Sequence, residues 1–248
     1  MDFPRPKSLL RRAGEASLIA SAAFALAPAP VLAPGLSPLA IALIVAFLIL
    51  SLGIHEAAHA WVAWRCGDST AKDLGRMTLN PIAHIDPWMT IIIPGLLAAM
   101  GGPIFGGAKP VPVSYHRLRH PLRDMALVAL AGPASNFLIA IVFAVAWKLC
   151  LGRAGYEPES LMVQVLLYSM FANIMLTAFN LLPIPPLDGS RVMTWLLPAS
   201  LRPGYQALER FGILIVFLAL YLPPVRRALN EMQRSILDVI DALTSVIA

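Results

Sequence analysis

The chain has 248 residues, of which 58% are hydrophobic and only 13% are charged, and its mean hydropathy is +0.72. This composition excludes an ordinary soluble domain and predicts an all-α protein that crosses a membrane several times. The net charge of +5 does not indicate nucleic-acid binding, because basic residues that flank membrane spans usually report topology.

The chain begins with a basic segment that precedes an apolar run from Ser17 to Leu32. By the positive-inside rule, the N-terminus is expected in the cytoplasm because of Arg5, Lys7, Arg11 and Arg12. The same pattern resembles a cleaved signal peptide, and this alternative stays open. In both cases the next span enters the membrane from outside.

Several further runs are long enough, or nearly long enough, to cross a bilayer, which takes about 20 apolar residues per helix. They are Leu39 to Trp64, Trp88 to Phe105, Met125 to Trp147, Leu161 to Leu182 and Phe211 to Leu222. We therefore expect four to six transmembrane helices in one membrane domain, residues 1–224, with a core over residues 39–191.

The Trp88 to Phe105 segment has two interpretations. Basic residues lie on both sides of it, and it contains glycine and proline. If both flanks are cytoplasmic, the segment is a re-entrant loop, whose irregular backbone is tolerated where it is buried in protein or lines a wet cavity. The alternative is an ordinary short helix, since the charge rule has exceptions.

Three ionisable residues, His55, Glu56 and His59, are the only ones between Leu39 and Trp64. Ionisable residues inside a span are candidates for a functional site. A spacing of four residues places the two histidines on one helix face, where they are able to bind one ion, and zinc is the metal expected. Glu56 is free to take a proton from a water molecule that the ion makes acidic.

A catalytic zinc site uses three protein ligands, so a third is needed. Asp188 is the candidate, because it follows an apolar run and would be costly there without a cation. The preceding prolines forbid regular helix and let the backbone turn this carboxylate toward a neighbouring span. They are Pro183, Pro185 and Pro186.

Two motifs together resemble the site-2 proteases, a family of intramembrane zinc metalloproteases. The first is the HExxH of His55 to His59, and the second is formed by Asn180, Pro183, Pro185, Leu187, Asp188 and Gly189. Further similar pieces lie at residues 80–87, 107–113 and 132–136. The resemblance is to a compact form of the family, without a PDZ or CBS domain.

The resemblance implies that His55, His59 and Asp188 bind one Zn2+ per chain and that Glu56 is the catalytic acid and base. It also implies that Asn180 lies near the metal and helps to hold substrate. The family's β-hairpin would correspond to the region from Phe105 to Val113. The stretch from Lys109 to Tyr115 suits an edge strand that pairs with an unwound substrate.

The function implied is hydrolysis of peptide bonds within or near transmembrane segments of membrane-protein substrates, as in regulated intramembrane proteolysis. The expected location is a bacterial-type inner membrane, with the site toward the cytoplasm. The partners are then a transmembrane substrate and the lipid bilayer, and a homo-oligomer stays open. The alternatives are an inactive zinc-binding scaffold, against which Glu56 counts, and a zinc transporter, which would spread its ligands along a path.

Three further features have plainer interpretations. Asn136 is favoured as a helix-packing residue, since small and polar residues serve that role in membranes. His84 is favoured as a turn residue beside Asp86 and two prolines. Residues 225–248 are expected to form an amphipathic helix that lies on the membrane surface.

Overall fold

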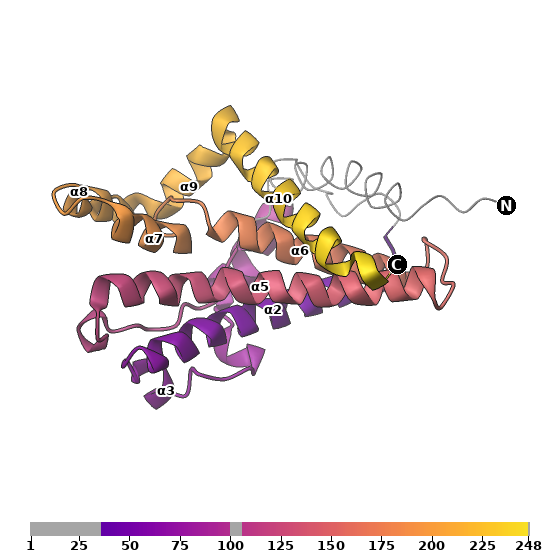
Figure 1. Cartoon of the computed structure of the whole chain (residues 1–248), viewed down its shortest axis with the longest axis horizontal. Coiled ribbons are helices and arrows are strands. Elements are labelled where there is room, and N and C mark those ends of the chain that lie inside the picture. The colour runs from indigo at the N-terminus through magenta and orange to yellow at the C-terminus, as the bar shows by residue number, and fades with distance from the viewer. Residues whose placement is uncertain (1–35, 100–105, 248) are drawn as a thin grey trace.

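A computed structural model describes residues 36–99 and 106–247 (Figure 1). The first apolar run, Ser17 to Leu32, and the end of the Trp88 to Phe105 segment lie outside these residues. The described part of the chain is built of helices and turns and contains no strand, which confirms the expectation of an all-α fold.

Four helical stretches in the described residues are long and apolar enough to cross a membrane. They are α2 (Pro38–Arg65), α5 (Pro121–Gly152), α6 (Leu161–Asn180) and the stretch Arg202–Tyr221. The last of these comprises α8 (Arg202–Ala207), a short turn and α9 (Gly212–Tyr221). This number agrees with the four to six crossings predicted.

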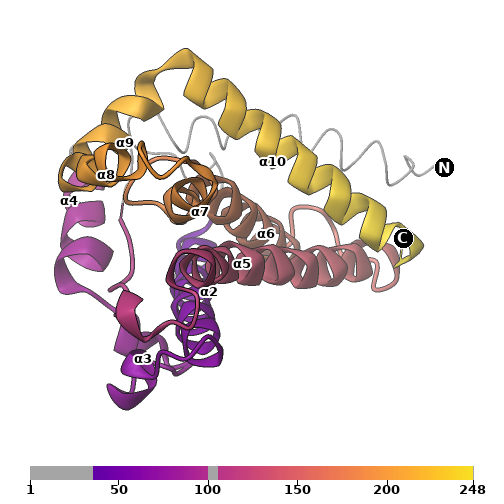
Figure 2. The same ribbon diagram turned by 60° about the vertical axis from the view of Figure 1, so that its left-hand side comes forward.

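Small residues bring α5 close to both of its main neighbours, α2 and α6 (Figures 1 and 2). The first half of α5 buries Ala126 and Ala129, while α2 buries Ala57 and Ala60. Such residues allow membrane helices to approach closely, so that van der Waals contact holds them. In the second half of α5, a cluster of larger side chains packs against α6; it includes Phe143, Trp147, Met170 and Ile174.

Between α2 and α5 the chain forms α3 (Thr70–Asp73), α4 (Ile93–Ala99) and three short helical segments, η1 (Pro81–His84), η2 (Pro87–Ile92) and η3 (Tyr115–Arg117). The amide of Gly107 donates to the Met89 carbonyl at 3.0 Å, and the Thr90 hydroxyl donates to the Gly107 carbonyl at 2.7 Å. Gly107 therefore lies beside Met89 and Thr90, so the chain comes back to the beginning of the Trp88 to Phe105 segment. This path favours the re-entrant interpretation of the segment over a simple crossing.

The prediction of an edge strand from Lys109 to Tyr115 is wrong, because residues 106–114 form no regular element. Pro110 and Pro112 have no N–H to give to a strand ladder. The amides of Lys109 and Val111 are used elsewhere, since they donate to the His84 carbonyl and to Glu56. Phe105, the first residue of the proposed hairpin region, lies outside the described residues.

The C-terminal helix α10 (Pro223–Thr244) is amphipathic, as predicted, and packs on α6 and α5 (Figure 1). Leu229 joins a buried cluster with Ala178 of α6, and Ile240 joins the cluster between α5 and α6. Part of the apolar face that we assigned to the membrane surface, around Leu229 and Ile240, is thus covered by other helices of this chain. The remaining helix, α7 (Asp188–Leu196), follows α6 and carries Asp188 at its first position.

Candidate metal centre

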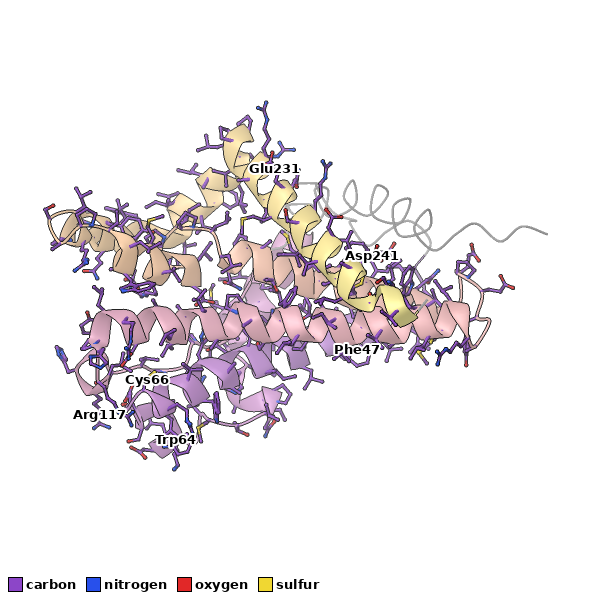
Figure 3. The ribbon with its side chains drawn as sticks, viewed as in Figure 1. Phe47, Trp64, Cys66, Arg117, Glu231 and Asp241 are labelled. Carbon is purple, nitrogen blue, oxygen red and sulfur yellow. The ribbon has the colours of Figure 1, made fainter. Side chains whose placement is uncertain are left out.

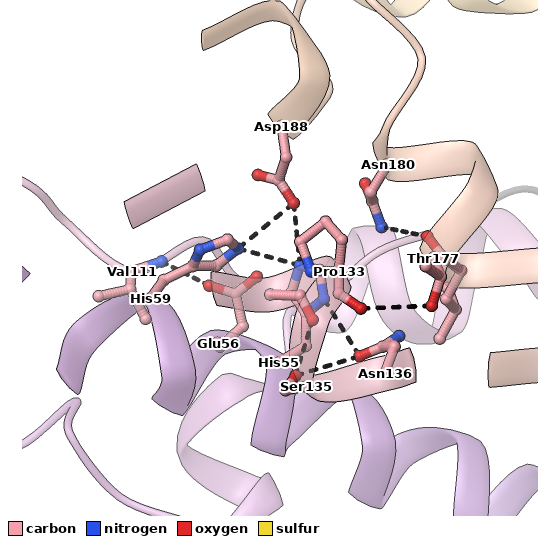
Figure 4. A network of polar contacts seen from close by, with 12 residues as sticks. His55, Glu56, His59, Val111, Pro133, Ser135, Asn136, Thr177, Asn180 and Asp188 are labelled. Atoms are coloured by element: carbon pink, nitrogen blue, oxygen red, sulfur yellow. Dashed lines mark hydrogen bonds and ion pairs between the residues drawn. The ribbon is translucent and has the colours of Figure 1, made fainter. Parts of the chain in front are cut away.

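Two histidines of α2 and the first residue of α7 meet at one point (Figure 4). The Nε2 atoms of His55 and His59 lie 3.0 Å apart, and Oδ2 of Asp188 lies 3.3 Å and 3.4 Å from them. Both histidines are buried. The structure therefore gathers the three residues that the sequence proposed as metal ligands.

The turn between α6 and α7 brings Asp188 into place. Three prolines end the helix after Asn180 and prevent it from restarting before Leu187. Gly189 then passes so close to the end of α6 that a side chain there would collide with the carbonyls of Leu181 and Leu182. The close passage of this glycine lets α7 begin directly beside the two histidines.

Hydrogen bonds on the far side of each imidazole fix which nitrogen faces the centre. Nδ1 of His59 lies 2.7 Å from the Val128 carbonyl, and Nδ1 of His55 lies 3.2 Å from Oδ1 of Asn136. Both partners are acceptors, so each Nδ1 carries the proton and each Nε2 presents a lone pair. The same arrangement orients histidines that bind metals in proteins.

The three facing atoms lie within 4.8 Å of one another, and each is a possible metal ligand. In the described part of the chain, Oδ2 of Asp188 is buried and accepts no hydrogen bond. Two imidazole lone pairs and a carboxylate therefore converge, and this donor set fits a zinc ion.

Helix α5 has a glycine where it faces the two histidines, and this glycine leaves room for such an ion. A Cβ atom at Gly132 would lie 2.5 Å from Nε2 of both histidines. Only glycine at this position lets α5 pass beside the two imidazoles without displacing them. The space at the centre is therefore bounded by three helices, α2, α5 and α7.

Comparison with known proteins places the chain in a family. The model of peptidase family M50 matches residues 42–160 and 154–223, which is most of the chain. The chain belongs to peptidase family M50. This confirms the resemblance to site-2 proteases and, together with the four apolar helices, indicates an integral membrane protein.

Named relatives of this M50 chain are described as metalloproteases. "Putative zinc metalloprotease YwhC" of Bacillus subtilis is 39% identical over 79% of this chain and 90% of its own length. "Putative zinc metalloprotease Rip2" of Mycolicibacterium smegmatis is 32% identical over 77% of this chain and 71% of its own length. No solved structure gives a significant match.

Glu56 lies next to the centre of this M50 chain and is also buried. Its Oε2 accepts a hydrogen bond of 2.8 Å from the amide of Val111, in the irregular segment that follows the re-entrant loop. A backbone N–H thus holds the carboxylate from the side of this segment (Figure 4). This contact has no signal in the sequence, because any residue except proline supplies the same donor.

Each of two asparagines that the sequence singled out makes a specific contact. Asn180, expected near the metal, donates to the Leu176 carbonyl of its own helix at 3.1 Å. Asn136, favoured as a packing residue, instead contacts His55. His84 contacts the Thr78 carbonyl in its own turn, as its turn interpretation predicts.

Proposed function

We propose that the chain is an intramembrane zinc metalloprotease that hydrolyses peptide bonds within or near transmembrane segments of membrane proteins. The observation that carries this proposal is the convergence of His55, His59 and Asp188, with Glu56 beside them, among helices long enough to span a bilayer. Membership of peptidase family M50 supports the same reaction class.

In this proposal His55, His59 and Asp188 would hold one zinc ion. Zinc supplies Lewis acidity there, polarising a peptide carbonyl and making water acidic near neutral pH. Glu56 takes the proton from the attacking water and returns it to the leaving amine. The hydrogen bond from the Val111 amide keeps the Glu56 carboxylate oriented before the reaction.

The substrate must lose helical hydrogen bonds before its peptide carbonyl is accessible. The segment over residues 106–114 forms no strand itself, but its backbone is suited to pair with an unwound substrate. Gly107, Lys109 and Val111 all direct their amides to groups of this chain, which leaves the opposite edge of the segment for a partner. Pro110 and Pro112 on that edge have no N–H. We infer that this edge offers carbonyl oxygens to the amides of an unwound substrate.

The proposed orientation places the site near the cytoplasmic side. The end of α2 carries Arg65, and the segment before α5 and its first turn carry Arg117, Arg119 and Arg123. The loop at the other end of α5 and α6 carries Glu157 and Glu159, with Arg153. Lys and Arg residues are enriched in cytoplasmic loops. In a bacterial-type cell, this bias directs the HExxH end of α2 toward the cytoplasm of the inner membrane.

The test is cleavage of single-span model substrates by the purified protein in liposomes, with bound zinc measured in the same samples. We expect product from the wild type and from Glu159→Gln, an exposed loop control with the same loss of charge. Glu56→Gln should keep its zinc and lose cleavage by at least 100-fold, because general acid and base catalysis contributes about 10²–10⁴-fold. Zinc binding without cleavage by the wild type, across many substrates, would instead favour a scaffold or transporter.

A further inference from the structure

Five cations gather around the end of α2, and we call them the basic patch: Arg65, Lys72, Arg117, Arg119 and Arg123. All five side chains are exposed. They come from three places in the chain, namely the last residue of α2, helix α3, and the segment that leads into α5 together with the first turn of α5. No metal ligand or catalytic residue proposed above belongs to the basic patch.

Backbone contacts hold the end of α2 against the segment that leads into α5. The amide of Arg119 donates to the Cys66 carbonyl at 3.0 Å, directly after α2 ends. At Gly67, a Cβ atom would lie 3.1 Å from the Arg117 carbonyl and 3.3 Å from Cγ of Arg119. Figure 3 shows Trp64, Cys66 and Arg117 at this same end of the molecule. The patch is therefore a fixed feature of the fold.

Few carboxylates neutralise the basic patch. Arg123 pairs with the buried Asp124 at 2.8 Å, and Arg117 lies 3.9 Å from Asp73. Across residues 36–99 and 106–247, the other three cations form no ion pair. They are Arg65, Lys72 and Arg119. Positive charge therefore remains available to an anionic partner.

Two tryptophans place the basic patch at the level of lipid headgroups. The Lys72 ammonium lies 4.6 Å from the centre of the Trp64 ring, and the Arg65 guanidinium lies 5.7 Å from that of Trp61. Both rings are exposed on the last turns of a membrane span. Tryptophan collects at the membrane–water interface, so the adjacent cations lie where lipid phosphates lie.

We propose that the basic patch binds the phosphate headgroups of anionic phospholipids. The proposal rests on the cytoplasmic orientation inferred above, because anionic lipids give the cytoplasmic leaflet its negative surface potential. A soluble phosphate would be drawn to the same charges but would make no use of the exposed tryptophans and the adjacent span ends. The bound lipid would also secure the segment that runs from Val111 to α5.

The experiment titrates dioleoylphosphatidylglycerol into the purified, zinc-loaded protein in detergent and counts bound lipids by native mass spectrometry. A triple variant, Lys72→Gln with Arg117→Gln and Arg119→Gln, is compared with the wild type. Each cation near a membrane surface contributes about five-fold in binding, so the triple variant should bind about 100-fold more weakly. The matched control removes three exposed arginines of α10, with Arg226→Gln, Arg227→Gln and Arg234→Gln, and should bind as the wild type does.

Three results would overturn the proposal. The first is equal binding of dioleoylphosphatidylcholine, and the second is equal binding of phosphatidylglycerol by the wild type and the triple variant. The third is displacement of the lipid by inorganic phosphate at the same concentration, which would assign the patch to a soluble anion. Zinc content and thermal midpoint report on folding. If the triple variant misfolds, Lys72→Gln alone should still weaken binding about five-fold.

Discussion

At the scale of single residues, Gly132 decides whether three helices fit around the centre. Because a Cβ atom would lie 2.5 Å from Nε2 of His55 and His59, we expect Gly132→Ala to displace both imidazoles. The purified variant should lose bound zinc while keeping its helical content, measured by elemental analysis and circular dichroism. Gly152→Ala is the matched control in the same helix, since nothing lies within 4 Å of a Cβ atom there. Full zinc occupancy in Gly132→Ala would contradict the assigned site.

Asn136 supports the same centre from behind. Its Oδ1 lies 3.2 Å from Nδ1 of His55 and keeps the lone pair on Nε2 directed toward Asp188. Loss of such an outer partner typically weakens metal binding about 10–100-fold. We expect Asn136→Leu to show a loss of this size in competition with a zinc chelator. Asn136→Asp keeps an acceptor oxygen and should bind zinc more tightly than Asn136→Leu; equal affinity would leave Asn136 as a packing residue only.

The two motifs in the sequence predicted which side chains meet, and their geometry agrees with that prediction. Helical spacing predicted that His55 and His59 meet. The cost of a carboxylate in an apolar setting predicted that Asp188 joins them. Asn136 and Gly132 were harder to assign, because small and polar residues on a membrane helix are usually explained by packing. Their role depends on which turn of α5 faces α2, and hydropathy alone does not determine that.

At the scale of elements, Asp68 ties the irregular segment to the end of α2. The carboxylate is fully buried and accepts hydrogen bonds from the amide of Ser114 at 2.6 Å and from the amide and hydroxyl of Thr70. Asp68→Ala would leave these donors without an acceptor, at a cost of about 1–3 kcal/mol for each one that stays buried. We expect amide hydrogen exchange over residues 107–119 to quicken by at least ten-fold.

Ser69→Ala provides the control for this change. Its hydroxyl donates to Asp73 at an exposed position next to Asp68, so its loss should leave exchange over residues 107–119 unchanged. If Asp68→Ala also left that exchange unchanged, the segment would be held by its other contacts. These are the hydrogen bonds of Gly107, Lys109 and Val111.

The membrane helices were predictable as elements, because a run of about twenty apolar residues has few stable structures other than a membrane-spanning helix. The segment over residues 106–114 was not, since alternating valines and prolines suit an edge strand equally well. Its conformation depends on distant acceptors, the His84 carbonyl and the Glu56 carboxylate. Such acceptors come from the tertiary fold, so a strand pattern over Lys109 to Tyr115 was a poor guide.

At the scale of the whole molecule, an ion pair within the described residues joins the C-terminal helix to the rest of the bundle. The Lys148 ammonium of α5 lies 2.9 Å from Oδ1 of Asp241 in α10. The lysine side chain is only 5% exposed, whereas the aspartate side chain is 33% exposed. The consequences of breaking the pair therefore depend on which partner is removed, because a buried charge left alone costs more than one that reaches water.

Asp241→Ala leaves the Lys148 charge buried between helices without its partner, and we expect it to lower the free energy of unfolding by about 3 kcal/mol. Lys148→Met keeps an apolar stem of similar length and leaves an aspartate that is able to turn toward water, so it should cost less. When Lys148 is already replaced by methionine, we expect Asp241→Ala to lower the free energy of unfolding only slightly. Unfolding in mixed micelles, followed by helical content, measures all four proteins of this cycle. Additive losses in the double variant would mean that the two charges do not interact, and that α10 is held on α5 and α6 by its apolar face alone.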